Sequence, residues 1–118
     1  MNPLGKKGEM IVRKYLLNKG YEILETNYRL PFGEIDIIAK DKNEIVFVEV
    51  KSVSSKNFFS QEKINSKKVK TLLKVAKTYL LKFQPNFSWR IDLVCVVQKN
   101  TRSFSLTHFK GAIRENLK

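Results

Sequence analysis

The sequence predicts a single α/β domain in which a helix, strands, a second helix and further strands follow one another along residues 1–118. Two observations support this prediction. Apolar residues recur at helical spacing in two segments, and between and after these segments apolar and polar residues alternate with the period of two that is typical of strands. The chain is long enough for one hydrophobic core, and no internal repeat or linker divides it.

The first helix should run from residue 3 or 4 to residue 18, with Gly20 just past its end, where glycine often terminates a helix. Glu9, Val12 and Leu16 are spaced at i, i+3 and i+7. Glu9 therefore shares the apolar stripe and is expected to point toward the protein. The alternative is an ordinary glutamate near a helix N-terminus, stabilised by the helix dipole.

A first strand is expected over residues 21–29, followed by two strands that carry charged residues. Residues 33–39 read Gly-Glu-Ile-Asp-Ile-Ile-Ala, and residues 46–51 read Val-Phe-Val-Glu-Val-Lys. Both alternate apolar and charged side chains, so each should have one apolar and one charged face. The polar segment 40–44 between them is short, which predicts an antiparallel hairpin.

The hairpin should bring acidic residues together. If its turn centres on residues 42–43, Asp36 lies opposite Glu49 and Glu34 lies opposite Lys51, with all four side chains on one face. Carboxylates that face each other repel unless a positive charge lies between them. The pattern therefore favours a bound cation.

This cluster has the composition of a metal-dependent nuclease site. Mg²⁺ or Mn²⁺, held by Asp36, Glu49 and the carbonyl of Val50, would acidify a bound water and stabilise charge on a phosphate. Lys51, on the face of Glu49, would orient the attacking water, accept its proton or offset that charge. The alternative is a solvated strand face with salt bridges, because short motifs such as Glu-x-Lys also occur by chance.

Charge composition points to a polyanionic partner. The chain has 23 Lys and Arg against 11 Asp and Glu, a net charge of +12. Such a field attracts phosphate backbones in a salt-dependent way. Nucleic acid is the expected partner, DNA rather than RNA. The sequence has no run of ~18 apolar residues, which would predict a membrane helix, and no start that resembles a signal peptide. We therefore expect a cytoplasmic protein.

The second helix should begin at Ser66, a suitable N-cap residue, and reach about residue 82. One face has apolar residues at i, i+3 and i+4 spacing, and the other face is expected to carry Lys67, Lys68, Lys70, Lys74 and Lys77. A stripe of side chains that are all positively charged suits contact with a phosphate backbone. The alternative is that these lysines form an ordinary solvated helix face.

Two further segments are candidates for nucleic-acid contact. Arg29, at the end of the first strand, would bind phosphate or be an ordinary surface arginine. Residues 52–61 should form a loop before the second helix. Within it, Phe58 and Phe59 would stack on bases, pack on the core or contact a second subunit.

The last two strands are expected at residues 89–97 and 103–109. Cys95 lies in an apolar run and is expected in the core. Asp92 should pair with Arg90 or a lysine rather than bind metal. His108 is the only histidine, which argues against a histidine-based metal site or a Ser-His-Asp type of catalysis.

Together these motifs resemble the YraN family of small bacterial proteins. The resemblance spans nearly the whole chain and is carried by Gly8-Glu9, Asn27-Tyr28-Arg29 and residues 33–39, 46–51, 67–81 and 90–94. That family is similar to the restriction-endonuclease-like, PD-D/E-x-K superfamily, and within it to archaeal Holliday-junction resolvases. The resemblance implies a mixed central sheet flanked by helices, and a homodimer as in resolvases.

By that resemblance Asp36 is the metal-binding acid, Glu49 and Lys51 are the E-x-K pair, and Glu9 is an additional metal-binding carboxylate. The implied activity is metal-dependent hydrolysis of DNA phosphodiesters, with branched or junction DNA among the candidate substrates. The alternatives are a non-catalytic DNA- or RNA-binding module and a small RNA-associated protein, because one fold can serve many functions.

Two departures from the superfamily pattern stand out. Ile35 precedes the acid where many members have proline, and Val53 stands where a basic residue is common. The second departure bears on how the segment after Lys51 contacts DNA.

Overall fold

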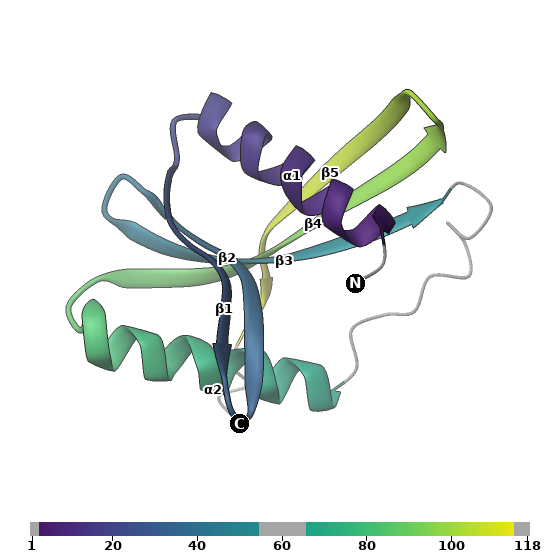
Figure 1. The fold of residues 1–118 in the computed structure, drawn as a ribbon. Coiled ribbons are helices and arrows are strands. Elements are labelled where there is room, and N and C mark those ends of the chain that lie inside the picture. Colours follow the sequence, from purple (N-terminus) through teal and green to yellow (C-terminus); the bar gives the residue numbers. More distant parts are fainter. Residues whose placement is uncertain (1–2, 55–65, 115–118) are drawn as a thin grey trace.

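The computed structural model describes residues 3–54 and 66–114, which form one five-stranded sheet with a helix on each face (Figure 1). The predicted α/β class, a mixed sheet flanked by helices, is confirmed. Phe58 and Phe59 lie outside the described residues. The elements are α1 (Pro3–Asn18), β1 (Glu22–Leu30), β2 (Gly33–Asp41), β3 (Glu44–Ser54), α2 (Ser66–Phe83), β4 (Ser88–Asn100) and β5 (Ser103–Ile113).

The strands lie in the order β1-β2-β3-β4-β5. Neighbouring strands are antiparallel except for β3 and β4, which are parallel and are separated in sequence by α2. Parallel neighbours need a crossover connection of this kind. Neither described helix is long and apolar enough to cross a membrane.

Two apolar clusters cover the two faces of the sheet. The cluster under α2 includes Phe47, Leu72 and Tyr79, and the cluster under α1 includes Leu16 and Val48. Because both faces are covered, residues 37–39 and 45–48 are buried throughout. The expectation of one charged face for each of these strands is therefore wrong over these residues, and charge is confined to their ends.

Helix α1 ends as the sequence predicts. Gly20 adopts a left-handed conformation with φ of 93°. Its N–H donates to the carbonyl of Leu17, and the N–H of Tyr21 donates to the carbonyl of Leu16 at 3.0 Å. These two bonds satisfy carbonyls that the helix end leaves unpaired. Tyr21 and Leu16 then pack in the same cluster, which directs the chain from α1 into β1.

The β2–β3 hairpin has the predicted turn, with Asp41 paired to Glu44 and Lys42 at a φ of 59°. The pairing between β2 and β3 runs from there to Ile37 and Val48. Glu34 is paired with Arg29 of β1, not with Lys51 as expected. The reason is that β2 separates from β3 beyond Ile37, so the hairpin does not extend to those residues.

Strand ends also differ from the sequence prediction. Ser52 and Ser54 belong to β3 rather than to a loop, because they pair with Val96 and Gln98 of the parallel neighbour β4. β5 continues to Ile113, which pairs with Ile91 and is buried. Local composition does not reveal these extensions, because their pairing partners are distant in sequence.

Close packing between the β1–β2 turn and α2 requires glycine at position 33. A Cβ atom there would stand 2.2 Å from Cγ2 of Thr71 and 3.2 Å from Cγ2 of Val75. Thr71 is held in place because its hydroxyl donates to the carbonyl of Lys67. Gly33 therefore determines how closely α2 approaches the start of β2.

We expect Gly33→Ala to lower the free energy of unfolding by about 1–3 kcal/mol, because the added methyl overpacks this contact. Thr71→Ser removes the clashing methyl and keeps the hydroxyl, so the double variant should recover most of the loss. Urea denaturation of both variants and of Thr71→Ser alone measures this coupling. Equal losses in the single and double variants would contradict the predicted contact.

Candidate active site

Asp36 lies at the point where β2 separates from β3. Its Oδ2 accepts a hydrogen bond from the backbone N–H of Val50 at 2.8 Å, so a side chain takes the place of a strand partner. Ile35 packs under α2 and Ile37 packs under α1. Residues two apart in a regular strand face the same way, so the pleat of β2 is interrupted at Asp36.

The strand on the other side of Asp36 is also irregular. β1 pairs with β2 through Thr26–Ile37 and Tyr28–Ile35, which places Asn27 opposite Asp36. Asn27 has a φ of 51°, a left-handed conformation that is uncommon for residues other than glycine. A cavity of about 230 Å³ opens here, lined by Lys6, Glu9, Met10, Arg13, Thr26, Asn27, Asp36 and Ile37.

Glu9 enters this cavity from α1. The helix lies close to β3 at this point, since a Cβ on Gly8 would stand 1.8 Å from Oγ of Ser52. Burial and the charge of Asp36 raise the pKa of Glu9, and a hydrogen bond from the Asn27 side chain acts against this rise. The expected orientation of Glu9, toward the protein, is confirmed, and the cavity that it lines also contains Asp36.

Asp36 and Glu49 form a half-buried pair of acids. Burial raises the pKa of Asp36, whereas hydrogen bonds from Val50 and Glu49 and the charge of Lys68 act against that rise. Burial and the charge of Asp36 raise the pKa of Glu49 to about 7. The two side chains are hydrogen-bonded, with the proton on Glu49, as expected when two carboxyl groups share one site.

The lysine that contacts this pair is not the one in the E-x-K motif. Nζ of Lys68, on α2, lies 3.2 Å from Oε2 of Glu49. Lys51 lies two residues beyond Glu49 in β3 and so on the same face of the strand. In the described part of the chain Lys51 forms no ion pair with either acid.

The donor atoms at this point suit a hard divalent cation. Asp36 and Glu49 supply carboxylate oxygens, and the carbonyl of Val50 faces the same gap, because the N–H and C=O of a strand residue point to one side. Among residues 3–54 and 66–114, no three His, Cys, Asp or Glu side chains are grouped closely enough to hold a metal ion. Mg²⁺, however, commonly uses one or two carboxylates and keeps several waters.

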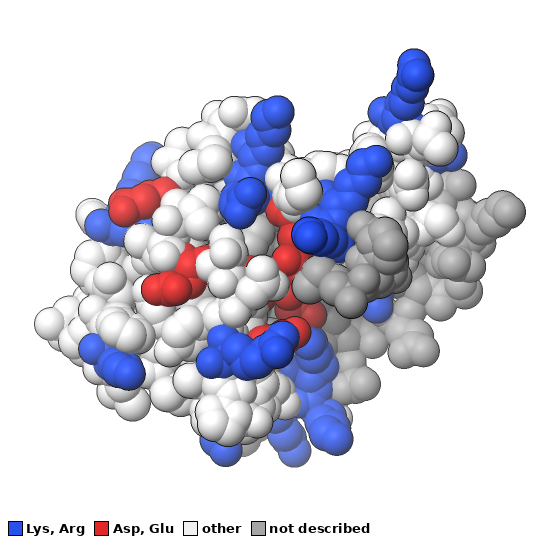
Figure 2. Space-filling view, viewed as in Figure 1, with Lys and Arg blue, Asp and Glu red and all other residues white. Residues whose placement is uncertain are grey.

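Basic side chains border the acidic centre. Figure 2 shows acidic side chains in the middle of one face, with basic side chains above and below them. The lysines expected to contact nucleic acid, Lys67, Lys70, Lys74 and Lys77, are exposed along α2. Lys68 is not part of that exposed stripe, which corrects the expectation that it lies on the outer face. Arg29 is 74% exposed and pairs with Glu34 at 2.6 Å.

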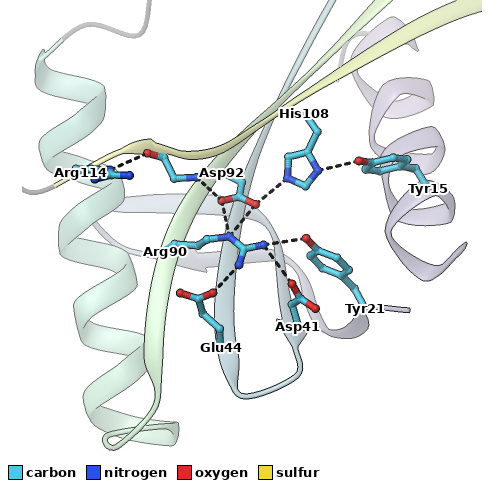
Figure 3. A network of polar contacts seen from close by, with 9 residues as sticks. Tyr15, Tyr21, Asp41, Glu44, Arg90, Asp92, His108 and Arg114 are labelled. Atoms are coloured by element: carbon cyan, nitrogen blue, oxygen red, sulfur yellow. Dashed lines mark hydrogen bonds and ion pairs between the residues drawn. The ribbon is translucent and has the colours of Figure 1, made fainter. Parts of the chain in front are cut away.

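A second charged cluster lies away from these acids and serves the fold (Figure 3). Asp92 is fully buried and accepts hydrogen bonds from Arg90, His108 and the N–H of Gly111. Burial would raise the pKa of Asp92, but these bonds hold it below its usual value. His108 also bonds to the hydroxyl of Tyr15 at 2.8 Å, which connects β5 to α1.

The cluster continues through Arg90, which contacts Glu44 at 2.5 Å and Asp41 at 3.5 Å in the β2–β3 hairpin. The expected pairing of Asp92 with Arg90 is confirmed, and so is the buried position of Cys95. His108 has both ring nitrogens engaged, one with Asp92 and one with Tyr15.

Sequence analysis placed Lys68 on the outer lysine stripe, and it did not identify Lys68 or Asn27 as neighbours of the acids. A signal for Lys68 was present, since it precedes Leu72 by four residues and Val75 by seven and so shares their buried stripe. Asn27 was noted for the family resemblance alone, because its place opposite Asp36 depends on strand register.

Comparison with known proteins identifies the family of this chain. The sequence model of the uncharacterised protein family UPF0102 matches residues 8–96. This protein belongs to that family. The resemblance to the YraN family, which is the same family, is thereby confirmed.

Named UPF0102 relatives match over most of both chains. A UPF0102 protein of Thermodesulfovibrio yellowstonii is 46% identical over 97 residues, 81% of this chain and 87% of the relative. One from Persephonella marina is 44% identical over 110 residues, 92% and 90% of the two chains. One from Campylobacter fetus is 40% identical over 98 residues, 83% and 87%. The UPF0102 match includes Glu9, Asp36 and the segment from Glu49 to Lys51.

Glu49 should make the stability of this UPF0102 protein depend on pH. Its pKa is about 7 in the folded protein, against 4.5 ordinarily, so the folded state retains a proton that the unfolded chain releases. This contribution favours folding below pH 4.5 and is lost as the pH rises to about 7. Relative to Glu49→Gln, the wild-type free energy of unfolding should fall by roughly 1–3 kcal/mol between about pH 5 and about pH 8.

Urea denaturation at both pH values measures this difference, with Glu22→Gln as the control because Glu22 is exposed on β1. The control should follow the wild type. Identical pH dependence in the wild type and in Glu49→Gln would show that Glu49 does not titrate in this range.

Proposed function

We propose that this protein is a Mg²⁺- or Mn²⁺-dependent endonuclease that hydrolyses DNA phosphodiester bonds. The observation that carries the proposal is the pair Asp36 and Glu49, which lie half-buried and hydrogen-bonded to each other where β2 separates from β3. Folding brings two carboxyl groups together at a cost in desolvation and repulsion. Such perturbed acids beside a cavity are typical of functional sites.

In this proposal Asp36, Glu49 and the carbonyl of Val50 hold the cation, and Glu9, in the adjoining cavity, adds negative charge from the α1 side. When bound, the divalent ion would lower the pKa of a water and offset negative charge on the phosphate. The protein itself positions the carboxylates that would hold the ion. The Val50 N–H fixes the orientation of Asp36, and the low exposure of the Glu49 side chain, 14%, limits its contact with bulk water.

Lys51 has the role of a general base or of a charge that stabilises the transition state. It follows Glu49 by two residues, so its side chain leaves the strand toward the same space. An amine there can accept a proton from the attacking water or approach the phosphate oxygens. Its half-buried position favours both roles because electrostatic interactions are stronger outside bulk water.

Binding of the nucleic acid is assigned to the exposed lysines of α2. Lys67, Lys70, Lys74 and Lys77 recur at intervals of three or four residues, so they form one stripe along the helix. The stripe starts in the turn that contains Lys68, which contacts Glu49. A phosphate backbone that follows the stripe therefore leads to the acids. Arg29 adds a further cation near the β1–β2 turn.

The preference for branched or junction DNA, and a homodimer that cuts two strands, extend the proposal through the resemblance to resolvases. The second candidate function is a non-catalytic DNA- or RNA-binding module. The net charge of +12 and the lysine stripe favour it, because neither feature depends on the acids.

Asp36→Asn should abolish metal-dependent cleavage while DNA affinity stays within about threefold of wild type, because it removes a metal ligand without altering the basic surface. The measurement uses labelled single-stranded, duplex and four-way-junction DNA with Mg²⁺, with Mn²⁺ and with chelator. Glu22→Gln is the matched control for loss of one surface carboxylate. Wild-type protein that binds DNA and cuts none of these substrates would support the binding module instead.

Replacement of Lys70, Lys74 and Lys77 by alanine should weaken DNA binding and reduce the slope of log affinity against log salt by roughly 2–3, about one for each lost phosphate contact. Fluorescence anisotropy over a range of salt concentrations measures this slope. The control replaces Lys14, Lys99 and Lys110, which carry the same charge on α1, β4 and β5. If both triple variants lose equal slope, net charge rather than the α2 stripe governs binding.

A further inference from the structure

Lys68 occupies an unusual position for a lysine on α2. It is four residues before Leu72 and seven before Val75, both of which are fully buried against the sheet. These intervals place Lys68 on the inward stripe, in the first turn of the helix. The side chain is 42% exposed, less than expected for a lysine on the outer face. The helix thus directs one of its lysines into the protein.

The target of Lys68 is the half-buried acid pair. Its Nζ lies 3.2 Å from Oε2 of Glu49, whose side chain is only 14% exposed. Its charge also acts on Asp36. In the free protein, Lys68 therefore supplies positive charge at the point where the proposed cation would bind. The N–H of Val50 adds a second favourable contact, to Asp36.

Two positive charges next to the same carboxylates compete for them. If the carboxylates bind a divalent ion, the ammonium of Lys68 loses much of its attraction to Glu49. The long, flexible stem of lysine lets the ammonium move by several ångströms without movement of the helix. An anion beside the cation, such as the phosphate of a bound DNA strand, can then take the place of Glu49 as a contact of the ammonium.

We infer that Lys68 is a phosphate-binding residue of this site, which holds Glu49 in the free protein and contacts the non-bridging oxygens of the substrate phosphate in the complex. This inference rests on the proposed function and adds a second lysine to Lys51. The two lysines have separate origins: Lys51 comes from β3, and Lys68 comes from α2. The position of Lys68 next to the exposed lysine stripe would place the scissile phosphate where that stripe meets the acids.

The test compares wild type, Lys68→Met and Lys68→Arg. Methionine keeps the apolar stem and removes the charge, and arginine keeps the charge. Lys82→Met is the control, because Lys82 is an exposed lysine in the last turn of the same helix. Calorimetry measures Mn²⁺ affinity without DNA, and single-turnover cleavage at saturating DNA measures the rate. Thermal unfolding checks that each variant is folded.

We expect Lys68→Met to cleave about 10²-fold more slowly than wild type at saturating DNA, which is the effect of losing one charge-stabilising contact. Its Mn²⁺ affinity should be equal to or tighter than that of wild type, because a competing charge is gone. Lys68→Arg should recover at least about tenfold of the lost rate, because it restores a cation. Lys82→Met should match the wild type in both measurements.

Two results would overturn the inference while leaving the proposed function intact. Cleavage by Lys68→Met at the wild-type rate would show that the phosphate does not depend on Lys68. Loss of Mn²⁺ affinity together with activity would show that Lys68 only maintains the position of Glu49. Wild-type protein that neither binds Mn²⁺ nor cleaves DNA would refute both the inference and the proposed function.

Discussion

The hydrogen bond from the N–H of Val50 to Asp36 is the contact on which the rest of the site depends. It forms where β2 leaves β3, and it satisfies a backbone donor that the separated strand no longer pairs. Without such a partner the separation would leave an unpaired N–H at a cost of about 1–3 kcal/mol. The side chain of Asp36 thus replaces the missing strand partner and places a carboxylate where β2 and β3 separate.

The opening explains why acids are found inside a strongly basic protein. Covered strands exclude charge, as residues 37–39 and 45–48 show. Within the described sheet, acids away from the strand ends are found where the sheet is interrupted, at Asp36 and Glu49, or where several partners surround the carboxylate, as at Asp92. Asp92 is hydrogen-bonded to Arg90, His108 and Gly111 and stabilises the fold. Asp36 and Glu49 have raised pKa values and lie beside Lys68, and in the proposed function this pair holds the cation.

The two helices contribute side chains to the site from opposite faces of the sheet. α1 delivers Glu9 to one face of the sheet, and its close approach to β3 depends on Gly8. α2 delivers Lys68 to the other face, and its close approach to β2 depends on Gly33. Asp36 lies between the faces because the pleat of its strand is interrupted. Substrate and metal would therefore meet groups from both layers at one break in the sheet.

The sequence by itself determined the order of elements, the end of α1 at Gly20, the turn at residues 42–43 and the pairing of Asp92 with Arg90, because each rests on local spacing or on neighbours close in the chain. It also placed Asp36 and Glu49 side by side, through the register of one hairpin. Only the tertiary structure decided where that hairpin opens, that Glu34 pairs with Arg29, and that Lys68 and Asn27 reach the acids. The Arg29–Glu34 pair depends on the register of the β1–β2 hairpin, and the other contacts join segments far apart in sequence or depend on an interrupted pleat. Periodicity within one segment carries no information about these features.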